Sequence, residues 1–224
     1  FLLMNNANKS KILPCYAIAG GNYEIIHILE NENISFKNDI SISTAIRFWR
    51  NDIVEYLEPQ PIDLFKYSSR YNNIELFVNN IPKSPINFDD DNDFKDICFK
   101  VGKHCYFDIF QFLYILYPDC LKEFDRKYSY IIHYAVNKNH YEMVKFICNQ
   151  NCDLNVTNGL FEPQLFEAVR NKNTEIIDLL CSYERTDLNM KDFHQNTALH
   201  YAIQGSSIDV IKIFLKYKSR LNTT

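Results

Sequence analysis

The residues of this chain that could carry out chemistry are its six histidines and seven cysteines. The nearest approach to metal-ligand spacing is the adjacent pair His104 and Cys105, and the pair Cys148 and Cys152. A zinc site needs four protein ligands, or three ligands and a water molecule, and neither pair has a second pair beside it. We therefore expect no metal and no other cofactor.

Nucleophilic catalysis finds no better support. A catalytic cysteine needs a neighbouring base and a group that orients this base, and no known signature surrounds any cysteine of the chain. The five glycines form no G-x-x-x-x-G-K loop that would bind a phosphate. The sequence therefore predicts that the chain is not an enzyme.

Composition narrows the cellular setting and the class of partner. An odd number of cysteines without a disulfide framework is typical of reduced thiols, so we expect a cytoplasmic (intracellular) protein. The net charge of −4 gives no overall attraction to nucleic acid or to an anionic membrane. No apolar run approaches the roughly 20 residues of a membrane span. We expect protein partners and a monomeric chain.

The elements that must position these side chains follow from an internal repeat. Seven times, a small or slim residue is followed seven positions later by an acid and two apolar residues, as in Ala202 with Asp209-Val210-Ile211. The repeats begin 33 or 34 residues apart from Ser68 onward and closer together before it. The small residues are Ala17, Ala45, Ser68, Val101, Ala135, Ala168 and Ala202. A fixed period of this length indicates a repeat array.

We predict that each repeat forms a short helix, a tight turn and a longer helix, because apolar residues recur at helical spacing on both sides of a few turn residues. The turns contain residues that tolerate a left-handed backbone, and the acid favours the start of the second helix. The turn residues are Gly20-Gly21-Asn22, Asn72-Asn73, Asn137–Asn139, Asn171–Asn173 and Gly205-Ser206. We expect an all-α solenoid in which each pair is stabilised by stacking on its neighbours.

The last repeat identifies a family. Its Thr197-Ala198-Leu199-His200-Tyr201-Ala202 resembles the Thr-Pro-Leu-His-x-Ala motif of the ankyrin repeat, and Asp153-Leu154-Asn155 and Asp187-Leu188-Asn189 resemble the Asp-Val-Asn that precedes the finger turn. The resemblance covers residues 120–224 and weakens toward the N-terminus. For residues 1–119 a helix-pair repeat of another family is the alternative. The chain is more similar to divergent, Asn- and Ile-rich ankyrin proteins of some protozoa than to the family consensus.

The repeats predict one ankyrin array over residues 1–224. It would hold a partial unit, 1–10, and units at about 11–37, 38–62, 63–90, 91–123, 124–157, 158–191 and 192–224, as a segment of a longer array. Residues 79–96, with two prolines and five aspartates, predict an irregular acidic loop. This loop is either a solvated surface or a docking site for a basic partner.

The resemblance also implies structural roles. His133 and His200 occupy the position at which the imidazole of the family hydrogen-bonds backbone in adjacent loops. Thr197 begins the motif, and Ala135, Ala168 and Ala202 are the small residues of the first helices. Trp49, between Phe48 and Arg50, is either an anchor for a partner or packed against a neighbouring turn.

The resemblance further implies that partners bind the concave face lined by fingers and first helices. By position, this face would present Lys103, His104, Arg126, Lys127, Ser129, Asn137, Lys138, Leu160, Glu162, Arg170, Asn171, Phe193, His194, Asn196 and Gln204. We expect a non-catalytic scaffold for protein–protein interaction, with charge that runs from acidic near residue 90 to basic near 127. The alternative is a substrate-recruiting module of a larger enzyme whose catalytic domain lies outside this chain.

Overall fold

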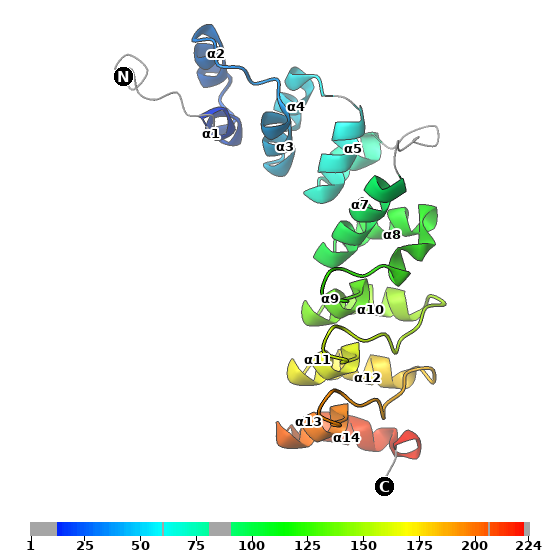
Figure 1. The fold of residues 1–224 in the computed structure, drawn as a ribbon. Coiled ribbons are helices and arrows are strands. Elements are labelled where there is room, and N and C mark those ends of the chain that lie inside the picture. Colours follow the sequence, from blue (N-terminus) through cyan, green and yellow to red (C-terminus); the bar gives the residue numbers. More distant parts are fainter. Residues whose placement is uncertain (1–12, 60, 81–90, 206, 222–224) are drawn as a thin grey trace. The chain divides into compact units, whose positions relative to one another are not determined.

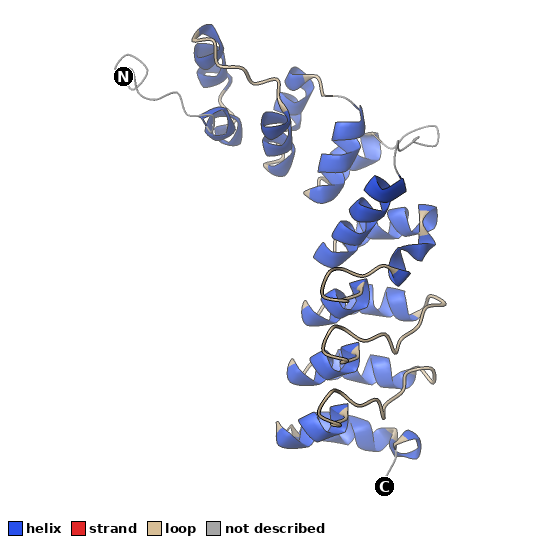
Figure 2. Ribbon diagram, in the orientation of Figure 1, coloured by secondary structure: helices blue, strands red, loops and turns tan. Residues whose placement is uncertain are grey.

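The computed structural model describes residues 13–59, 61–80, 91–205 and 207–221 (Figure 1). The chain divides into two compact units, Phe1–Asp89 and Asp90–Thr224. In the described residues of both units the regular structure is helical, as Figure 2 shows, so the predicted all-α class is confirmed.

The first unit contains three helix pairs. They are α1 (Leu13–Gly20) with α2 (Tyr23–Asn31), α3 (Asp39–Arg47) with α4 (Asn51–Leu57), and α5 (Pro61–Arg70) with α6 (Ile74–Asn79). Helix α1 packs on α3, and α3 packs on α5. Ile18, Ile26, Ile46 and Ile53 are fully buried between the pairs, so each pair covers the apolar side of the next.

The second unit contains four pairs and two short 3-10 turns. These are α7 (Asp91–His104) with α8 (Phe107–Leu116) and η1 (Pro118–Lys122), α9 (Ile131–Asn137) with α10 (Tyr141–Cys148), α11 (Gln164–Arg170) with α12 (Thr174–Ser182), and α13 (Ala198–Gln204) with α14 (Ile208–Lys216) and η2 (Lys218–Arg220). The first helices α7, α9, α11 and α13 pack in one row, and α10, α12 and α14 form a second row beside it (Figure 1).

Two predictions about these elements are wrong in part. From residue 39 to residue 116 the first helix of each pair is the longer one, with 14 residues in α7 against 10 in α8. The predicted acidic loop over 79–96 fails at both ends, because Asn79 ends α6 and residues 91–96 begin α7. Acidic residues are favoured in the first turn of a helix as well as in loops. Residues 81–90 of that prediction lie outside the described residues.

In six of the seven described pairs, the turn contains one residue in the left-handed region. Gly21, Asn72 and Asn139 were expected there, with φ of 67°, 55° and 55°, whereas Gly205 of the last pair has a φ of −74°. Trp49, Cys105 and Lys172 adopt the same conformation, although a side chain with a Cβ is disfavoured at positive φ. Trp49 is 51% exposed at this turn. The geometry of the turn therefore overrides residue preference at half of these positions.

Asparagine side chains then start the second helices. Asn22 accepts hydrogen bonds from the backbone N–H of Glu24 and Ile25, at 2.9 and 3.3 Å. Asn73 accepts one from Leu76 at 3.2 Å and also donates to the carbonyl of Ile46 at 3.2 Å, in the preceding pair. Asn73 is fully buried, whereas Asn22 is exposed. One side chain thus caps a helix and joins two repeats.

Histidine side chains start two of the first helices. Nδ1 of His133 accepts a hydrogen bond from the backbone N–H of Tyr130 at 3.2 Å, and Nδ1 of His200 accepts one from Thr197 at 3.1 Å. The Thr197 hydroxyl also lies 2.8 Å from Nδ1 of His200. His133 is buried and His200 is exposed. Burial lowers the pKa of His133, against an opposing effect of nearby backbone groups of Glu162 and Tyr130.

Substitution of Asn73 tests the double role of the turn asparagine. We expect Asn73→Ala to lower the free energy of unfolding by about 2–3 kcal/mol, because it removes a cap and leaves buried backbone groups without a partner. Asn22→Ala, which removes an exposed cap alone, should cost about 1 kcal/mol. Urea unfolding measures both. Equal losses would show that the bond to Ile46 adds no stability.

The buried imidazole of His133 makes stability depend on pH. Since its folded pKa is lowered, stability is complete above the unfolded pKa of about 6.5 and is lost as pH falls through the folded pKa. The loss is at most about 1.4 kcal/mol per pH unit, the slope for one proton. Urea unfolding between pH 7.5 and 5.5 should show a smaller loss for His133→Gln than for the unmodified chain. His200→Gln is the control, and an equal slope in all three chains would contradict the assignment.

Candidate functional site

Three projecting turns in the second unit carry many of the predicted site residues. An antiparallel bridge closes each of them, pairing Phe124 with Tyr130, Thr157 with Pro163, and Lys191 with Thr197. We name these turns the first finger (residues 124–130), the second finger (157–163) and the third finger (191–197). Each finger leads directly into a first helix, so the helix row fixes the spacing of the fingers.

One acidic or amide side chain shapes each finger. Oδ1 of Asp125 accepts hydrogen bonds from the backbone N–H of Lys127 and Ser129, at 2.8 and 3.1 Å. Asn158 accepts hydrogen bonds from the backbone N–H of Leu160 and Glu162, at 2.8 and 3.2 Å. Asp192 accepts hydrogen bonds from the backbone N–H of His194 and Asn196, both at 2.9 Å. This local hydrogen bonding holds the turn without any contribution from the side chains at its tip.

The tips of the fingers are left-handed. Tyr128, Phe161 and Gln195 have φ of 56°, 58° and 65°, in the region that favours glycine. The geometry of the finger therefore overrides residue preference at all three tips. Tyr128 is 60% exposed and Phe161 is 62% exposed, so both rings lie on the surface.

Neighbouring fingers are joined by their backbones. The N–H of Gly159 donates to the carbonyl of Lys127 at 2.9 Å. A Cβ at residue 159 would lie 2.9 Å from the same carbonyl oxygen. Only glycine permits this approach, and the first and second fingers are consequently held side by side.

Asp125 also connects the first finger to two helices. Its Oδ2 accepts a hydrogen bond from the Tyr134 hydroxyl and pairs with Lys103 at 3.4 Å. Burial raises the pKa of Asp125, but the hydrogen bonds from Tyr134 and from the backbone outweigh it and lower the pKa to about 2. Asp192 has the same arrangement with the hydroxyl of Tyr201. These carboxylates therefore have a structural role and are unsuited to proton transfer near neutral pH.

The second finger has a different connection, which corrects one predicted site residue. Glu162 was expected on the binding surface, but it is only 7% exposed. Both of its oxygens pair with the guanidinium of Arg170, at 2.8 and 2.7 Å. Arg170 also pairs with Glu167 at 2.8 Å. The position of Glu162 in the sequence predicted an exposed residue of the finger. Its ion pair with Arg170 instead keeps the carboxylate buried.

The remaining predicted site residues are on the surface, in fingers and in first helices. Ser129, Asn196 and Lys103 are partly buried. The exposed residues are His104, Arg126, Lys127, Asn137, Lys138, Leu160, Arg170, Asn171, Phe193, His194 and Gln204. We name the surface formed by the three fingers and the exposed sides of α7, α9, α11 and α13 the finger face.

Several polar residues of the finger face bond to the adjacent repeat. Lys138 donates to the carbonyl of His104 at 3.1 Å, and Asn137 donates to Glu167 at 2.7 Å. Asn171 donates to the carbonyl of Asn137 at 3.5 Å. In contrast, Arg126 and Lys127 form no ion pair with any described residue. The charge at the tip of the first finger is therefore available to a partner.

Sequence reasoning missed the aromatic residues of the fingers. Phe124 is 50% exposed and stacks on Tyr128 at a centroid distance of 5.6 Å. Phe124, Tyr128 and Phe161 were not among the residues expected on the binding face. The signal that could have found them is their fixed place three residues after Asp125 and Asn158, where a left-handed turn directs the side chain outward.

Several of the cysteines are buried thiols of low reactivity. Burial raises the pKa of Cys120, Cys148 and Cys181 to about 12, so these thiols stay protonated at neutral pH. Cys105 lies buried in the turn after α7, and Cys152 donates to the carbonyl of Ile147 at 3.4 Å. Over the described ranges, no three His, Cys, Asp or Glu side chains converge as metal ligands.

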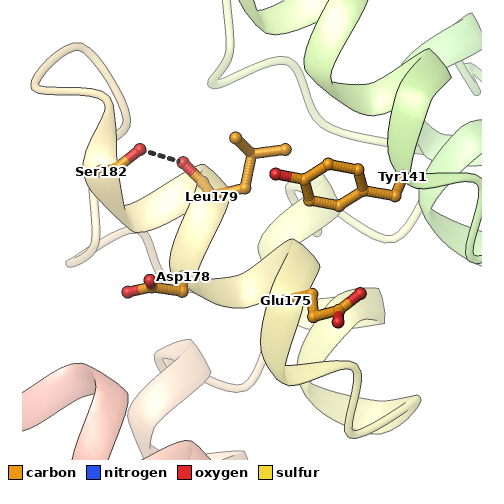
Figure 3. Close-up of a pocket in the computed structure, with 5 residues that line it drawn as sticks. All are labelled: Tyr141, Glu175, Asp178, Leu179 and Ser182. Atoms are coloured by element: carbon orange, nitrogen blue, oxygen red, sulfur yellow. Dashed lines mark hydrogen bonds between the residues drawn. The ribbon is translucent and has the colours of Figure 1, made fainter.

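Two hollows lie on the second helices, away from the fingers. One, of about 520 Å³, is lined by Tyr141, Leu179 and Ser182 with two carboxylates of α12, Glu175 and Asp178 (Figure 3). In this view the two carboxylates extend from the helix in different directions. Oδ1 of Asp178 forms an ion pair with Nζ of Lys216 at 2.8 Å, and this pairing lowers the pKa of Asp178. The hollow therefore offers no acid and base pair.

A third hollow of about 370 Å³ lies between α7 and the start of the first finger. Its wall includes Phe99 and Phe124, and its rim includes Lys95 and Arg126. It belongs to the finger face. Among the described helices, none has the length and apolar character that crossing a membrane requires.

Substitution of Gly159 tests how the fingers are held. Gly159→Ala places a methyl group against the carbonyl of Lys127 and breaks the 2.9 Å hydrogen bond. We expect a loss of about 1–2 kcal/mol in the free energy of unfolding. Gly20→Ala is the control, because a Cβ there meets nothing within 4 Å. Urea unfolding measures the stability of both variants. If Gly159→Ala were as stable as Gly20→Ala, the contact between the first and second fingers would add no stability.

Comparison with curated proteins finds similarity to segments of much longer chains. Alpha-latrocrustotoxin-Lt1a of Latrodectus tredecimguttatus is 25% identical over 201 residues, which are 81% of this chain and 14% of the toxin. The human transient receptor potential cation channel subfamily A member 1 is 30% identical over 98 residues, 44% of this chain and 9% of the channel. The chain thus spans a small part of the length of either relative.

Comparison with solved structures finds the same fold. An ankyrin repeat domain from Acinetobacter baumannii AYE matches with a TM-score of 0.61 at 19% identity, over 80% of this chain and 98% of that domain. The family model for ankyrin repeats (3 copies) matches residues 98–192 and 132–224, which together exceed half of the chain. The chain belongs to the ankyrin-repeat family.

Proposed function

We propose that this chain is a non-catalytic scaffold that binds a protein partner through the finger face, the concave face of the related repeats. Ankyrin repeats are protein-interaction modules. The observation that carries the choice of face is the exposure of large apolar side chains at the finger tips. Phe193 is 75% exposed, Leu160 66%, Phe161 62% and Tyr128 60%. Buried contacts with such residues supply much of the binding energy of protein interfaces.

The way the fingers are built supports this proposal. The bonds to Asp125, Asn158 and Asp192 fix each turn from the inside, so the tip side chains are free to contact a partner. A surface that is ordered before binding loses less conformational entropy in the complex, about 0.5–1.5 kcal/mol less for each side chain that is already fixed. Many shallow contacts on such a surface suit a protein better than a small molecule.

Charge along the finger face would orient the partner. The first finger contributes Arg126 and Lys127, and the next two contribute Leu160, Phe161 and Phe193. A partner with an acidic region beside an apolar region matches this order. Complementary charge mainly sets orientation and the rate of association. We further propose that the scaffold acts as a monomer in the cytoplasm and binds neither nucleic acid nor membrane.

The test uses two tip residues from different fingers. The double variant Lys127→Glu with Phe193→Ala should weaken a captured partner by about 30-fold or more, which corresponds to about 2 kcal/mol for the loss of a central contact. Affinity capture from the source cell lysate would identify the partner, and titration of the purified partner would measure the loss.

The control carries the same kinds of substitution on the second helices. Lys145→Glu with Leu215→Ala changes an exposed lysine of α10 and an exposed leucine of α14. It should retain affinity within about threefold, less than 1 kcal/mol. If the control loses the partner while the finger variant keeps it, the finger face is the wrong surface.

A further inference from the structure

The hollow between α7 and the first finger has two aromatic walls. Phe99 of α7 is partly buried, and Phe124 of the finger is 50% exposed. Its volume of about 370 Å³ lies near the lower end of the roughly 300–1,000 Å³ that ligand sites occupy. A hollow of this size suits one or two side chains of a partner better than a large ligand.

The aromatic walls are held by other rings. Phe99 contacts Tyr134 edge to face at a centroid distance of 6.4 Å, and Phe124 lies 5.6 Å from Tyr128 and 5.4 Å from Tyr130. Lys103 lies 4.5 Å above the ring of Tyr134 and pairs with Asp125. The contacts of Asp125 with Tyr134 and Lys103 fix the first finger, and they therefore also keep the hollow open between α7 and residues 124–126.

The charges of the rim are unevenly paired. Lys103 is neutralised by Asp125, and Lys100 pairs with Asp96. Lys95 lies 5.9 Å from the centroid of the Tyr117 ring, and neither Lys95 nor Arg126 forms an ion pair with a side chain that the structure describes. Glu123 is the remaining rim carboxylate, and it accepts a hydrogen bond from the hydroxyl of Tyr117 at 2.9 Å. Two cations thus flank an aromatic hollow in a chain with a net charge of −4.

We propose that this hollow binds an acidic segment of a protein partner that carries an aromatic side chain. The ring would enter between Phe99 and Phe124, and carboxylates on either side of it would pair with Lys95 and Arg126. Aromatic pairs and exposed charge pairs each add a modest energy, and the rigid hollow makes the two act together. The inference rests on the proposed finger face and names the class of partner that it binds.

The experiment measures peptide affinity by fluorescence anisotropy with the full chain. The probe is a fluorescein-labelled Asp-Asp-Phe-Asp-Asp peptide, compared with Asp-Asp-Ala-Asp-Asp and Lys-Lys-Phe-Lys-Lys. We expect the alanine peptide to bind about tenfold more weakly and the lysine peptide not to bind. Raising the salt from 0.05 to 0.5 M should weaken the first peptide, because exposed charge pairs are screened.

Variants locate the site. Arg126→Glu and Phe124→Ala should each weaken the phenylalanine peptide by about tenfold, whereas Lys145→Glu, which changes an exposed lysine of α10 outside the finger face, should change it less than threefold. Both substituted pocket residues are exposed, and urea unfolding checks that each variant remains folded. Equal losses in Arg126→Glu and Lys145→Glu would show general attraction to the chain and overturn the proposal.

Other outcomes also overturn it, and they are distinct from failure of the scaffold function. Equal binding of the phenylalanine and alanine peptides would exclude the aromatic anchor, and binding of no acidic peptide would exclude this class of partner. Tighter binding of single-stranded oligodeoxythymidylate than of any peptide would assign the rings and cations to nucleic acid. The proposed function fails separately, if a captured partner binds the double variant Lys127→Glu with Phe193→Ala as tightly as it binds the unmodified chain.

Discussion

Within each unit, the structure depends on the burial of each helix pair against the next one. Helices as short as the seven residues of α9 and α11 are unstable alone in water, so tertiary packing must supply their stability. Ala135, Ala168 and Ala202 are almost fully buried in the first helices, and their small side chains allow these helices to pack closely.

The close packing of the first helices also brings the fingers together. Because the spacing of the helices is fixed, the N–H of Gly159 reaches the carbonyl of Lys127, and neighbouring turns support each other. The residues that hold a finger are Asp125, Asn158 and Asp192, whose side chains point into the turn. The side chains that hold each finger are therefore different from the tip side chains through which we propose that a partner binds.

The hollow beside α7 also depends on a residue that holds a finger. Asp125 uses one oxygen to shape the first finger and the other to bind Tyr134 and Lys103. Asp125 neutralises Lys103, whereas Lys95 and Arg126 at the rim form no ion pair with any side chain that the structure describes. A structural ion pair next to an unpaired cation gives the finger face a local positive charge within an acidic chain.

The sequence by itself determined the helix pairs, most of their turns and the family, because apolar periodicity and turn residues are local signals that recur at a fixed period. It also placed Arg126, Lys127 and Phe193 on the surface. Only the tertiary structure decided that Glu162 turns inward, that α7 begins at Asp91, and that Phe124 and Phe99 face one hollow. Each of these depends on a partner from another element, such as Arg170 for Glu162, and the order of residues does not specify which partner is near.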